Sequence, residues 1–253
     1  MFYKLESLRG VAACLVFIHH SPFLVADQSC GFVNSSYLFV DYFFILSGFV
    51  VTHAYRAKIL TGMSFRQYFS LRLGRLYPVH LFAHLLYAAN IFGKWLIHRA
   101  GFGATNPADW VNTPSFFINL CLFQAFGLQD YLYWNRPSWS ISSELVTYVV
   151  FFVLTLTCDR RPRIVPLLIG VVALYAVLLG WPSRHLNYTY DFGLLRCVAG
   201  FYLGSALYRL RARMASGQDA SGNIASAWSR ARWSWTPAQQ TVAELGCLGA
   251  VAL

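Results

Sequence analysis

The sequence predicts an all-α, polytopic transmembrane helix bundle, and its composition, apolar runs and charge distribution all indicate this class. Of the 253 residues, 57% are hydrophobic and only 12% are charged, whereas soluble domains carry about 25% charged residues. The mean hydropathy of +0.47 excludes an intrinsically disordered chain, because disorder requires low hydrophobicity. Aromatic residues make up 17% of the chain, which suits a membrane protein with aromatic belts at its two interfaces.

Apolar runs recur along the chain, and a helix needs about 20 such residues to cross the hydrocarbon core. We expect about seven spans. They cover approximately residues 8–25, 37–54, 76–97, 140–158, 164–181 and 191–208, with a seventh that begins near Thr241. This last run ends about 13 residues later at Leu253, short of a full crossing. We therefore expect residues 1–253 to form a single transmembrane domain that is truncated at its C-terminus.

The first run, 8–25, resembles a secretory signal because Lys4 and Arg9 precede it. No small-residue cleavage site follows, and the polar sequence His19-His20-Ser21-Pro22 ends the strongly apolar part. We therefore interpret this run as the first membrane helix.

The basic residues predict the orientation of the bundle. The N-terminus and segments 56–75, 159–163 and 209–232 are basic, whereas the loops 26–36 and 182–190 are poor in Lys and Arg. Because basic loops stay in the cytoplasm, a cytoplasmic N-terminus requires that the moderately apolar stretch 116–128 does not cross. We expect that stretch to form a re-entrant or surface-lying helix, and the Ser-, Gly- and Ala-containing segment 209–240 to form a flexible basic loop.

The net charge of +10 has a simple explanation in this arrangement. Twenty Lys and Arg residues stand against ten Asp and Glu residues, and most of the basic ones lie between apolar runs. Positive-inside loop bias therefore explains the excess better than binding to nucleic acid, which we do not expect as a partner.

No motif indicates a metal or a bound cofactor. None of the six cysteines forms a C-x-x-C pair. His80 and His84 are four residues apart but lack the glutamate of the H-E-x-x-H pattern, so we interpret them as packing or interfacial residues. Phosphate-loop, dinucleotide-binding and serine-hydrolase motifs are also absent from the sequence.

Ionisable residues within membrane spans are functional candidates because a charge in hydrocarbon is costly. Arg9 and His20 are eleven residues apart, so they share one helix face about 16 Å apart along the axis. The predicted topology places His20, Asp41, Glu144 and Asp191 in one layer near the outer surface. A histidine beside a carboxylate suits general base chemistry. The alternatives are an interfacial histidine and solvated carboxylates, and for Asp191 we favour the latter.

A second layer near the cytoplasm is basic. Arg9, Arg56, Arg72 and Arg75 lie there, and Arg72 and Arg75 are neighbours if their segment is helical. Two guanidinium groups on one face can bind phosphates through paired hydrogen bonds. The alternative is positive-inside charge in contact with anionic lipid, and residue spacing alone does not separate the two. The adjacent Ser47-Gly48 pair indicates either close helix packing or a ligand channel beside the first helix.

Four segments, in this order, resemble those of the membrane acyltransferase family 3. They are Leu5-Glu6-Ser7-Leu8-Arg9-Gly10 followed by His20, Val40-Asp41-Tyr42-Phe43-Phe44-Ile45-Leu46-Ser47-Gly48-Phe49, Arg72-Leu73-Gly74-Arg75-Leu76-Tyr77-Pro78, and Trp139-Ser140-Ile141-Ser142-Ser143-Glu144. Together with the weaker Phe201-Tyr202-Leu203-Gly204, they cover most of residues 5–205. Family members usually have about ten spans, more than this chain contains.

The resemblance implies an O-acyltransferase of the inner (plasma) membrane that takes an acyl group, often acetyl, from acyl-CoA on the cytoplasmic side. The acceptor would be a carbohydrate hydroxyl of a cell-surface or exported glycan, as in polysaccharide or lipopolysaccharide O-acetylation. By motif match, His20 would be the catalytic histidine and Glu144 would assist it. Donor binding would fall to Arg9, Arg72 and Arg75, and the pocket would be shaped by Asp41, Ser47, Trp139 and Ser140.

Two other interpretations remain open at this stage. A secondary transporter or exporter would use the same buried charges as a proton relay, although no internal repeat is evident. The second interpretation is an inactive fragment, because the chain stops within an apolar run.

Overall fold

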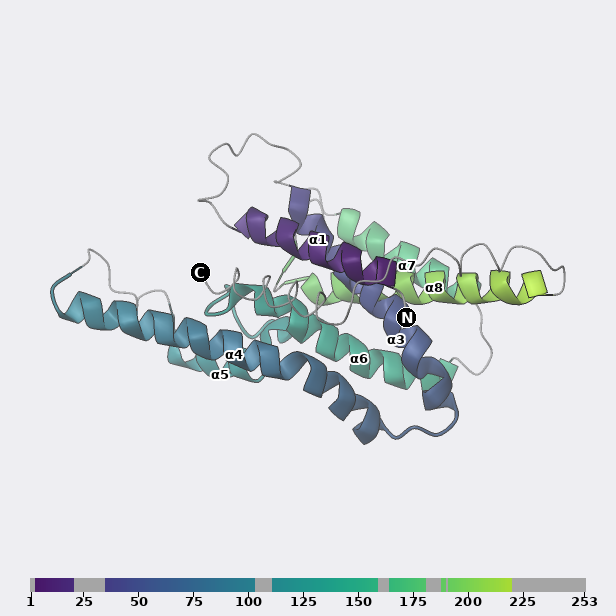
Figure 1. Cartoon of the computed structure of the whole chain (residues 1–253), viewed down its shortest axis with the longest axis horizontal. Helices are drawn as coiled ribbons and strands as arrows, with labels where there is room; N and C mark the ends of the chain where they lie inside the picture. Colours follow the sequence, from purple (N-terminus) through teal and green to yellow (C-terminus); the bar gives the residue numbers. More distant parts are fainter. Residues whose placement is uncertain are drawn as a thin grey trace. The chain divides into compact units, whose positions relative to one another are not determined.

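The computed structural model of the chain describes residues 3–20, 35–102, 111–158, 164–180, 188–189 and 191–219. Within these ranges, the side chains of residues 3–7, 19, 20 and 215–219 are not described. The described residues form helices joined by turns and contain no strand, as Figure 1 shows. The prediction of an all-α protein is therefore confirmed. The predicted seventh span, which begins near Thr241, lies outside the described residues.

The helices follow the predicted apolar runs in order. They are α1 (Tyr3–His20), η1 (Ser35–Leu38), α3 (Phe39–Leu60), α4 (Phe65–Arg99), α5 (Thr113–Leu120), η3 (Gln124–Phe126), η4 (Arg136–Ser138), α6 (Trp139–Cys158), α7 (Ile164–Leu179) and α8 (Gly193–Asp219). Among the described residues, two continuous helical stretches are long and apolar enough to cross a membrane: Ser35–Leu60 with 26 residues and Arg136–Cys158 with 23. The apolar stretches Leu8–Ile18 and Ile164–Leu179 are shorter, so the expectation of about seven spans is not confirmed.

Two segments that we expected to be basic loops are largely helical. In segment 56–75, α3 continues to Leu60 and α4 begins at Phe65, after Ser64 accepts a hydrogen bond from the Gln67 backbone nitrogen at 3.3 Å. Likewise α8 continues to Asp219, through the first part of the predicted loop 209–240. Arg, Leu, Ala and Met are among the best helix formers, so a polar composition did not mark the ends of these helices.

Helix α4 is the longest element and differs from the expected third span in two respects. Its 35 residues correspond to about 52 Å at 1.5 Å per residue. Pro78, expected near a helix start, lies inside it, where the ring removes one backbone hydrogen bond. The stretch 116–128, by contrast, contains the end of the 8-residue α5 and the 3-residue η3, and neither approaches the length of a crossing helix.

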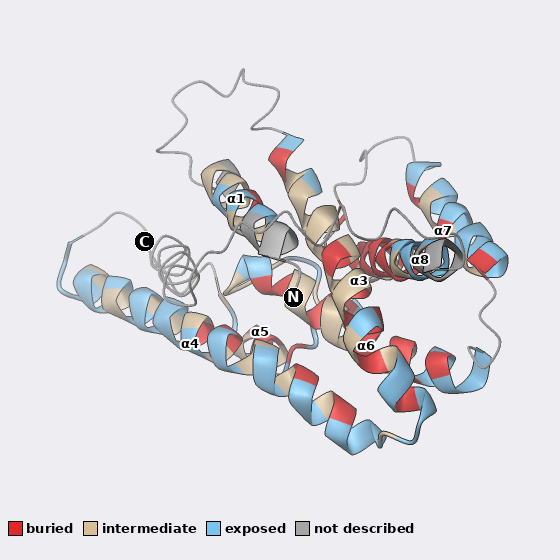
Figure 2. Cartoon of the chain, turned by 45° about the vertical axis from the view of Figure 1, so that its right-hand side comes forward, coloured by how far each residue is buried: buried red, intermediate tan, exposed pale blue. Residues whose placement is uncertain are grey.

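The chain divides into two compact units. The first comprises Met1–Ala54, Arg163–Ala173 and Ala199–Leu253, and the second comprises Tyr55–Pro162 and Leu174–Val198. In the first unit, α1 contacts η1, and α3 packs against α8 without intervening side chains. A Cβ added to Gly48 would lie 1.8 Å from the Phe201 carbonyl oxygen, and one added to Gly204 would lie 1.8 Å from that of Ile45. Figure 2 shows buried residues concentrated along α8.

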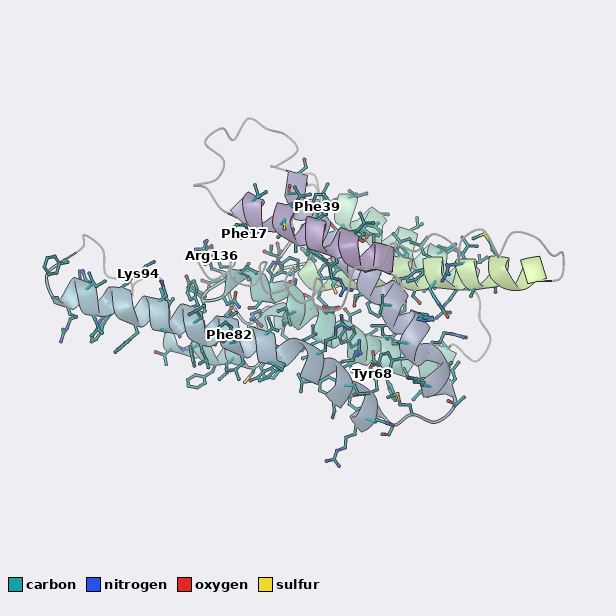
Figure 3. All side chains as sticks on the ribbon, viewed as in Figure 1. Phe17, Phe39, Tyr68, Phe82, Lys94 and Arg136 are labelled. Carbon is teal, nitrogen blue, oxygen red and sulfur yellow. The ribbon has the colours of Figure 1, made fainter. Side chains whose placement is uncertain are left out.

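In the second unit, α6 contacts α4, η3 and η4, and α4 also contacts α5; α5 runs beside α4 in Figures 1 and 2. The α4–α6 contact is aromatic, with the Tyr68 ring 5.4 Å from that of Phe152 and 6.4 Å from that of Phe151. Tyr68 is 0% exposed, whereas Phe82 on the same helix is 64% exposed, and both are labelled in Figure 3. This packing fixes the face of α4 that carries Arg72.

Candidate functional site

Arg72 is a buried cation in the second unit. Its side chain is 8% exposed, and no Asp or Glu among the described residues forms an ion pair with it. Its Nη2 donates a hydrogen bond to the Tyr55 hydroxyl, while its Nε has no hydrogen-bond partner. Because a buried charge is costly unless it is paired, this guanidinium is suited to bind an anion.

Two tyrosine rings surround the Arg72 guanidinium. Its Cζ lies 4.2 Å from the centroid of the Tyr55 ring and 5.9 Å from that of the Tyr148 ring. Cation–ring contacts of this kind stabilise a desolvated arginine by up to about 2 kcal/mol. The rings therefore hold the cation in place without neutralising its charge.

Glu144 is connected to the same tyrosine pair. It lies in the second turn of α6, and its Oε1 accepts a hydrogen bond of 2.6 Å from the Tyr148 hydroxyl one turn later. Tyr148 is buried, and Glu144 is half-buried. The structure thus brings Arg72 and Glu144 beside the same tyrosine, whereas the sequence had placed them in separate inner and outer layers.

Arg75 has a different environment from Arg72. Both lie on α4, within a segment that we expected to be a basic loop, but Arg75 is exposed. Three residues of helix rotate one side chain about 60° from the other. The structure therefore separates the predicted pair into one buried and one exposed arginine.

Trp139 and Ser140 have well-defined packing at the start of α6. The Trp139 indole is buried beside Gly193, at which an added Cβ would lie 2.6 Å from its Cζ3 atom. The buried Arg196 guanidinium carbon lies 5.9 Å from the same ring, and Arg196 donates to the Tyr188 carbonyl at 3.1 Å. Ser140 donates to the Pro137 carbonyl at 2.9 Å. Trp139 thus anchors α6 on the first turn of α8.

A buried polar network joins α5 to the segment before α6. Gln124 Nε2 donates to Asn119 Oδ1 at 2.9 Å and to Ser138 Oγ at 2.7 Å. Ser142 Oγ donates to the Leu122 carbonyl at 2.6 Å. Leu122 has φ +58°, a strained conformation for a branched residue. Gln124 Oε1 has no hydrogen-bond partner, but the other bonds tie the segment between α5 and α6 to both helices.

His80 and His84 are packing residues, as the sequence indicated. Both are buried, with ring centroids 5.8 Å apart. His80 Nε2 lies 2.9 Å from the Asn119 carbonyl, and the His84 ring lies 4.6 Å from that of Phe116. No group of three or more His, Cys, Asp or Glu side chains that would hold a metal occurs among the described residues.

The remaining predicted residues lie in the first unit. Arg9 on α1 is half-buried, as are Asp41 and Ser47 on α3. Asp41 lies in the first turn of α3, where a carboxylate interacts favourably with the helix dipole. His20 is the last residue of α1, and its side chain lies outside the described part of the structure. That His20 faces Glu144 therefore stays a prediction.

Sequence reasoning missed Tyr55 and Tyr148. The signal for Tyr148 was present, because residues four apart on a helix are neighbours and Tyr148 follows Glu144 by four. Tyr55 carried no such signal, since it is seventeen residues from Arg72 and the contact depends on how α3 and α4 meet.

Comparisons with known proteins identify the family of the chain. A family model described as an acyltransferase domain matches residues 2–231. Protein 2 of the picA locus of Rhizobium radiobacter is 32% identical over 163 residues, which cover 59% of this chain and 80% of that protein. No solved structure matches the chain. The family match covers almost the whole sequence, including all four motif segments, and the chain therefore belongs to acyltransferase family 3, a family of membrane-associated acyltransferases.

Proposed function

We propose that this acyltransferase moves an acyl group, often acetyl, from acyl-CoA to a hydroxyl of a cell-surface or exported glycan. The observation that carries the proposal is the Arg72 guanidinium, which is buried and has no carboxylate partner among the described residues. Coenzyme A carries several phosphate groups, and a guanidinium binds phosphate through paired, charge-assisted hydrogen bonds. Arg72 would bind the donor, with Arg9 and Arg75 supporting the same anionic ligand.

The proposed chemistry is direct transfer. His20 takes the proton from the acceptor hydroxyl as that oxygen attacks the thioester carbonyl carbon. The new ester bond forms, the carbon–sulfur bond breaks, and the proton leaves with the coenzyme A thiol. Glu144 orients the imidazole and stabilises its protonated form. Asp41, Ser47, Trp139 and Ser140 would shape the pocket around the reacting groups.

We further propose that the protein lies in the inner (plasma) membrane with its N-terminus in the cytoplasm. The donor would then approach the basic layer from the cytoplasm, and the acceptor, a polysaccharide or lipopolysaccharide, would meet His20 near the outer surface. Arg9 and His20 are about 16 Å apart along α1, a length that suits an extended pantetheine arm. The proposed reaction uses no resident cofactor, and nucleic acid is not a proposed partner.

The test is a transfer assay in proteoliposomes that contain the purified protein. Acetyl-CoA labelled in the acetyl group is supplied on one side, and free coenzyme A and labelled glycan are measured. We expect both products to appear in equal amounts. A transporter would move solute without consuming thioester, and that result would contradict the proposal. Mass spectrometry of surface glycans from cells with and without the gene identifies the acceptor.

Replacing Arg72 with alanine should weaken coenzyme A binding by roughly 10- to 150-fold, because hydrogen bonds to charged groups contribute about 1.5–3 kcal/mol. Isothermal titration with coenzyme A in detergent measures the change. Arg72→Lys keeps the charge but loses the planar, paired geometry, so its affinity should be intermediate.

The matched control for Arg72→Ala is Arg66→Ala, which removes an exposed arginine from the first turn of the same helix. Its affinity for coenzyme A should stay within twofold of the wild type. Equal affinities for the Arg72 variants and the wild type, in proteins of unchanged thermal stability, would remove Arg72 from the donor site.

A further inference from the structure

The Tyr55 ring contacts two cations that come from different helices. The Arg72 guanidinium carbon lies 4.2 Å from the ring centroid, and the Lys58 ammonium nitrogen lies 5.5 Å from it. Tyr55 and Lys58 lie near the C-terminal end of α3, outside the four motif segments, whereas Arg72 lies on α4. Two positive charges beside one buried ring make the potential at this point positive.

These two cations are not neutralised by any acidic side chain that the structure describes. Neither Arg72 nor Lys58 forms an ion pair with a described residue. Like charges repel each other, and most strongly where the effective dielectric is low. An anion that binds beside both cations would therefore remove an unfavourable interaction as well as form favourable ones.

The Tyr55 hydroxyl carries a proton for which the described residues offer no acceptor. An arginine side chain only donates hydrogen bonds, so the hydroxyl oxygen is the acceptor in its bond with Arg72 Nη2. The hydroxyl donates to no described group, and Tyr55 is only 9% exposed. The buried Nε of Arg72 also lacks a partner. Because buried donors without acceptors are costly, these two favour a ligand whose oxygens only accept, such as phosphate.

We propose that Tyr55 and Lys58 complete the donor site around Arg72. The Tyr55 hydroxyl donates a hydrogen bond to a phosphate oxygen of coenzyme A, and the Lys58 ammonium supplies a second positive charge. This inference rests on the proposed function, in which Arg72 binds the donor. Anionic lipid headgroups also carry phosphate, but the burial of Tyr55 and Arg72 suits a ligand that enters the protein rather than one at its surface.

Lys58 has a simpler explanation that the experiment must separate from this one. It lies in the last turn of α3, where a cation interacts favourably with the helix dipole. That role alone would change the thermal stability of the protein and leave its affinity for coenzyme A unaltered. Both quantities are therefore measured for each variant.

Tyr55→Phe removes the hydroxyl and keeps the ring, whose centroid lies 5.3 Å from that of Tyr68. Coenzyme A affinity, measured by isothermal titration in detergent, should fall roughly tenfold or more, because a hydrogen bond to a charged group is lost. Wild-type affinity in Tyr55→Phe, in a preparation where Arg72→Ala binds weakly, overturns the inference.

The deciding measurement is the double variant Tyr55→Phe/Arg72→Ala. A hydroxyl that contacts phosphate itself still contributes when Arg72 is absent, so the double variant should bind coenzyme A at least about threefold more weakly than Arg72→Ala. Equal affinities of these two variants would mean that the hydroxyl acts only by holding Arg72, and the inference would fail.

Lys58→Ala should lower the affinity for coenzyme A by about two- to fivefold, because an exposed charge contributes less than a buried one. The loss should disappear at high salt, which screens exposed charges. Lys94→Ala is the matched control, because it removes another exposed lysine, near the C-terminal end of α4. Its affinity should equal that of the wild type. Equal affinities of Lys58→Ala and Lys94→Ala would remove Lys58 from the site and overturn the inference.

Tyr188→Phe is the control for Tyr55→Phe, because it removes another buried hydroxyl of the same unit, one that donates to the Leu178 carbonyl at 3.0 Å. It should bind coenzyme A as the wild type does. Short-chain phosphatidylglycerol is titrated in parallel. If Tyr55→Phe and Lys58→Ala weaken the binding of this lipid and not of coenzyme A, the residues bind headgroups and the inference is wrong. Failure of the wild-type protein itself to bind coenzyme A would instead overturn the proposed function.

Discussion

Alanine at Gly204 should prevent α3 and α8 from packing at their present distance. The added Cβ would lie 1.8 Å from the Ile45 carbonyl oxygen and 2.8 Å from the Phe49 backbone nitrogen. Both are backbone atoms inside a helix, so neither can move aside as a flexible side chain would. Overpacking costs about 1–3 kcal/mol, and occasionally more, and we expect the high end here. Thermal unfolding followed by tryptophan fluorescence in detergent, with gel filtration, measures the loss.

Gly48→Ala should have the same effect from the other helix, since its Cβ would lie 1.8 Å from the Phe201 carbonyl oxygen. The control is Gly170→Ala on α7, where an added Cβ meets nothing within 4 Å among the described residues. That variant should be as stable as the wild type or slightly more so, because alanine favours a helix by about 1 kcal/mol over glycine. Normal stability of both packing variants would contradict this close approach.

Alanine at position 20 should abolish acyl transfer while leaving the protein folded. A general base contributes about 10²- to 10⁴-fold to the rate, so labelled glycan should fall to background in the proteoliposome assay. Coenzyme A binding should stay near the wild-type value, because the residues proposed to bind the donor are Arg9, Arg72 and Arg75 and do not include His20. This combination of retained binding and lost turnover separates a catalytic role from a defect in folding.

The adjacent residue supplies the control for this variant. His19→Ala removes a neighbouring imidazole that is rotated about 100° around the helix from His20. It should retain most of the transfer activity and the same membrane insertion. Near-normal transfer by His20→Ala, or loss of transfer only in His19→Ala, would remove His20 from the proposed role.

The sequence predicted the strongly apolar helices well and the polar ones poorly. Helices α6 and α7 begin within a residue of the predicted 140–158 and 164–181, because hydropathy changes sharply at those points. Helix α4 instead begins eleven residues before the predicted 76–97. Its first turns are basic, and a basic segment forms a helix as readily as an apolar one when a cap such as Ser64 is present.

The candidate site was predicted in its motif residues but not in its contacts. Motif order identified Arg72 and Glu144, while the aromatic neighbours that join them come from helix packing. Spacing likewise left two interpretations of Ser47-Gly48 open. The structure gives Gly48 a packing role, because the Phe201 backbone occupies the position of a side chain. The order of residues alone does not give the distance between the backbones of α3 and α8.

The length of α4 can be compared with the thickness of a lipid bilayer. Helix α4 is not one of the two described stretches that are apolar enough to cross a membrane, and its length of about 52 Å exceeds the hydrocarbon thickness of about 30 Å. Arg66 and Arg99 lie near its two ends. Were such a rod to cross a bilayer, it would extend beyond the hydrocarbon core, and tilting it would move its two ends in opposite directions.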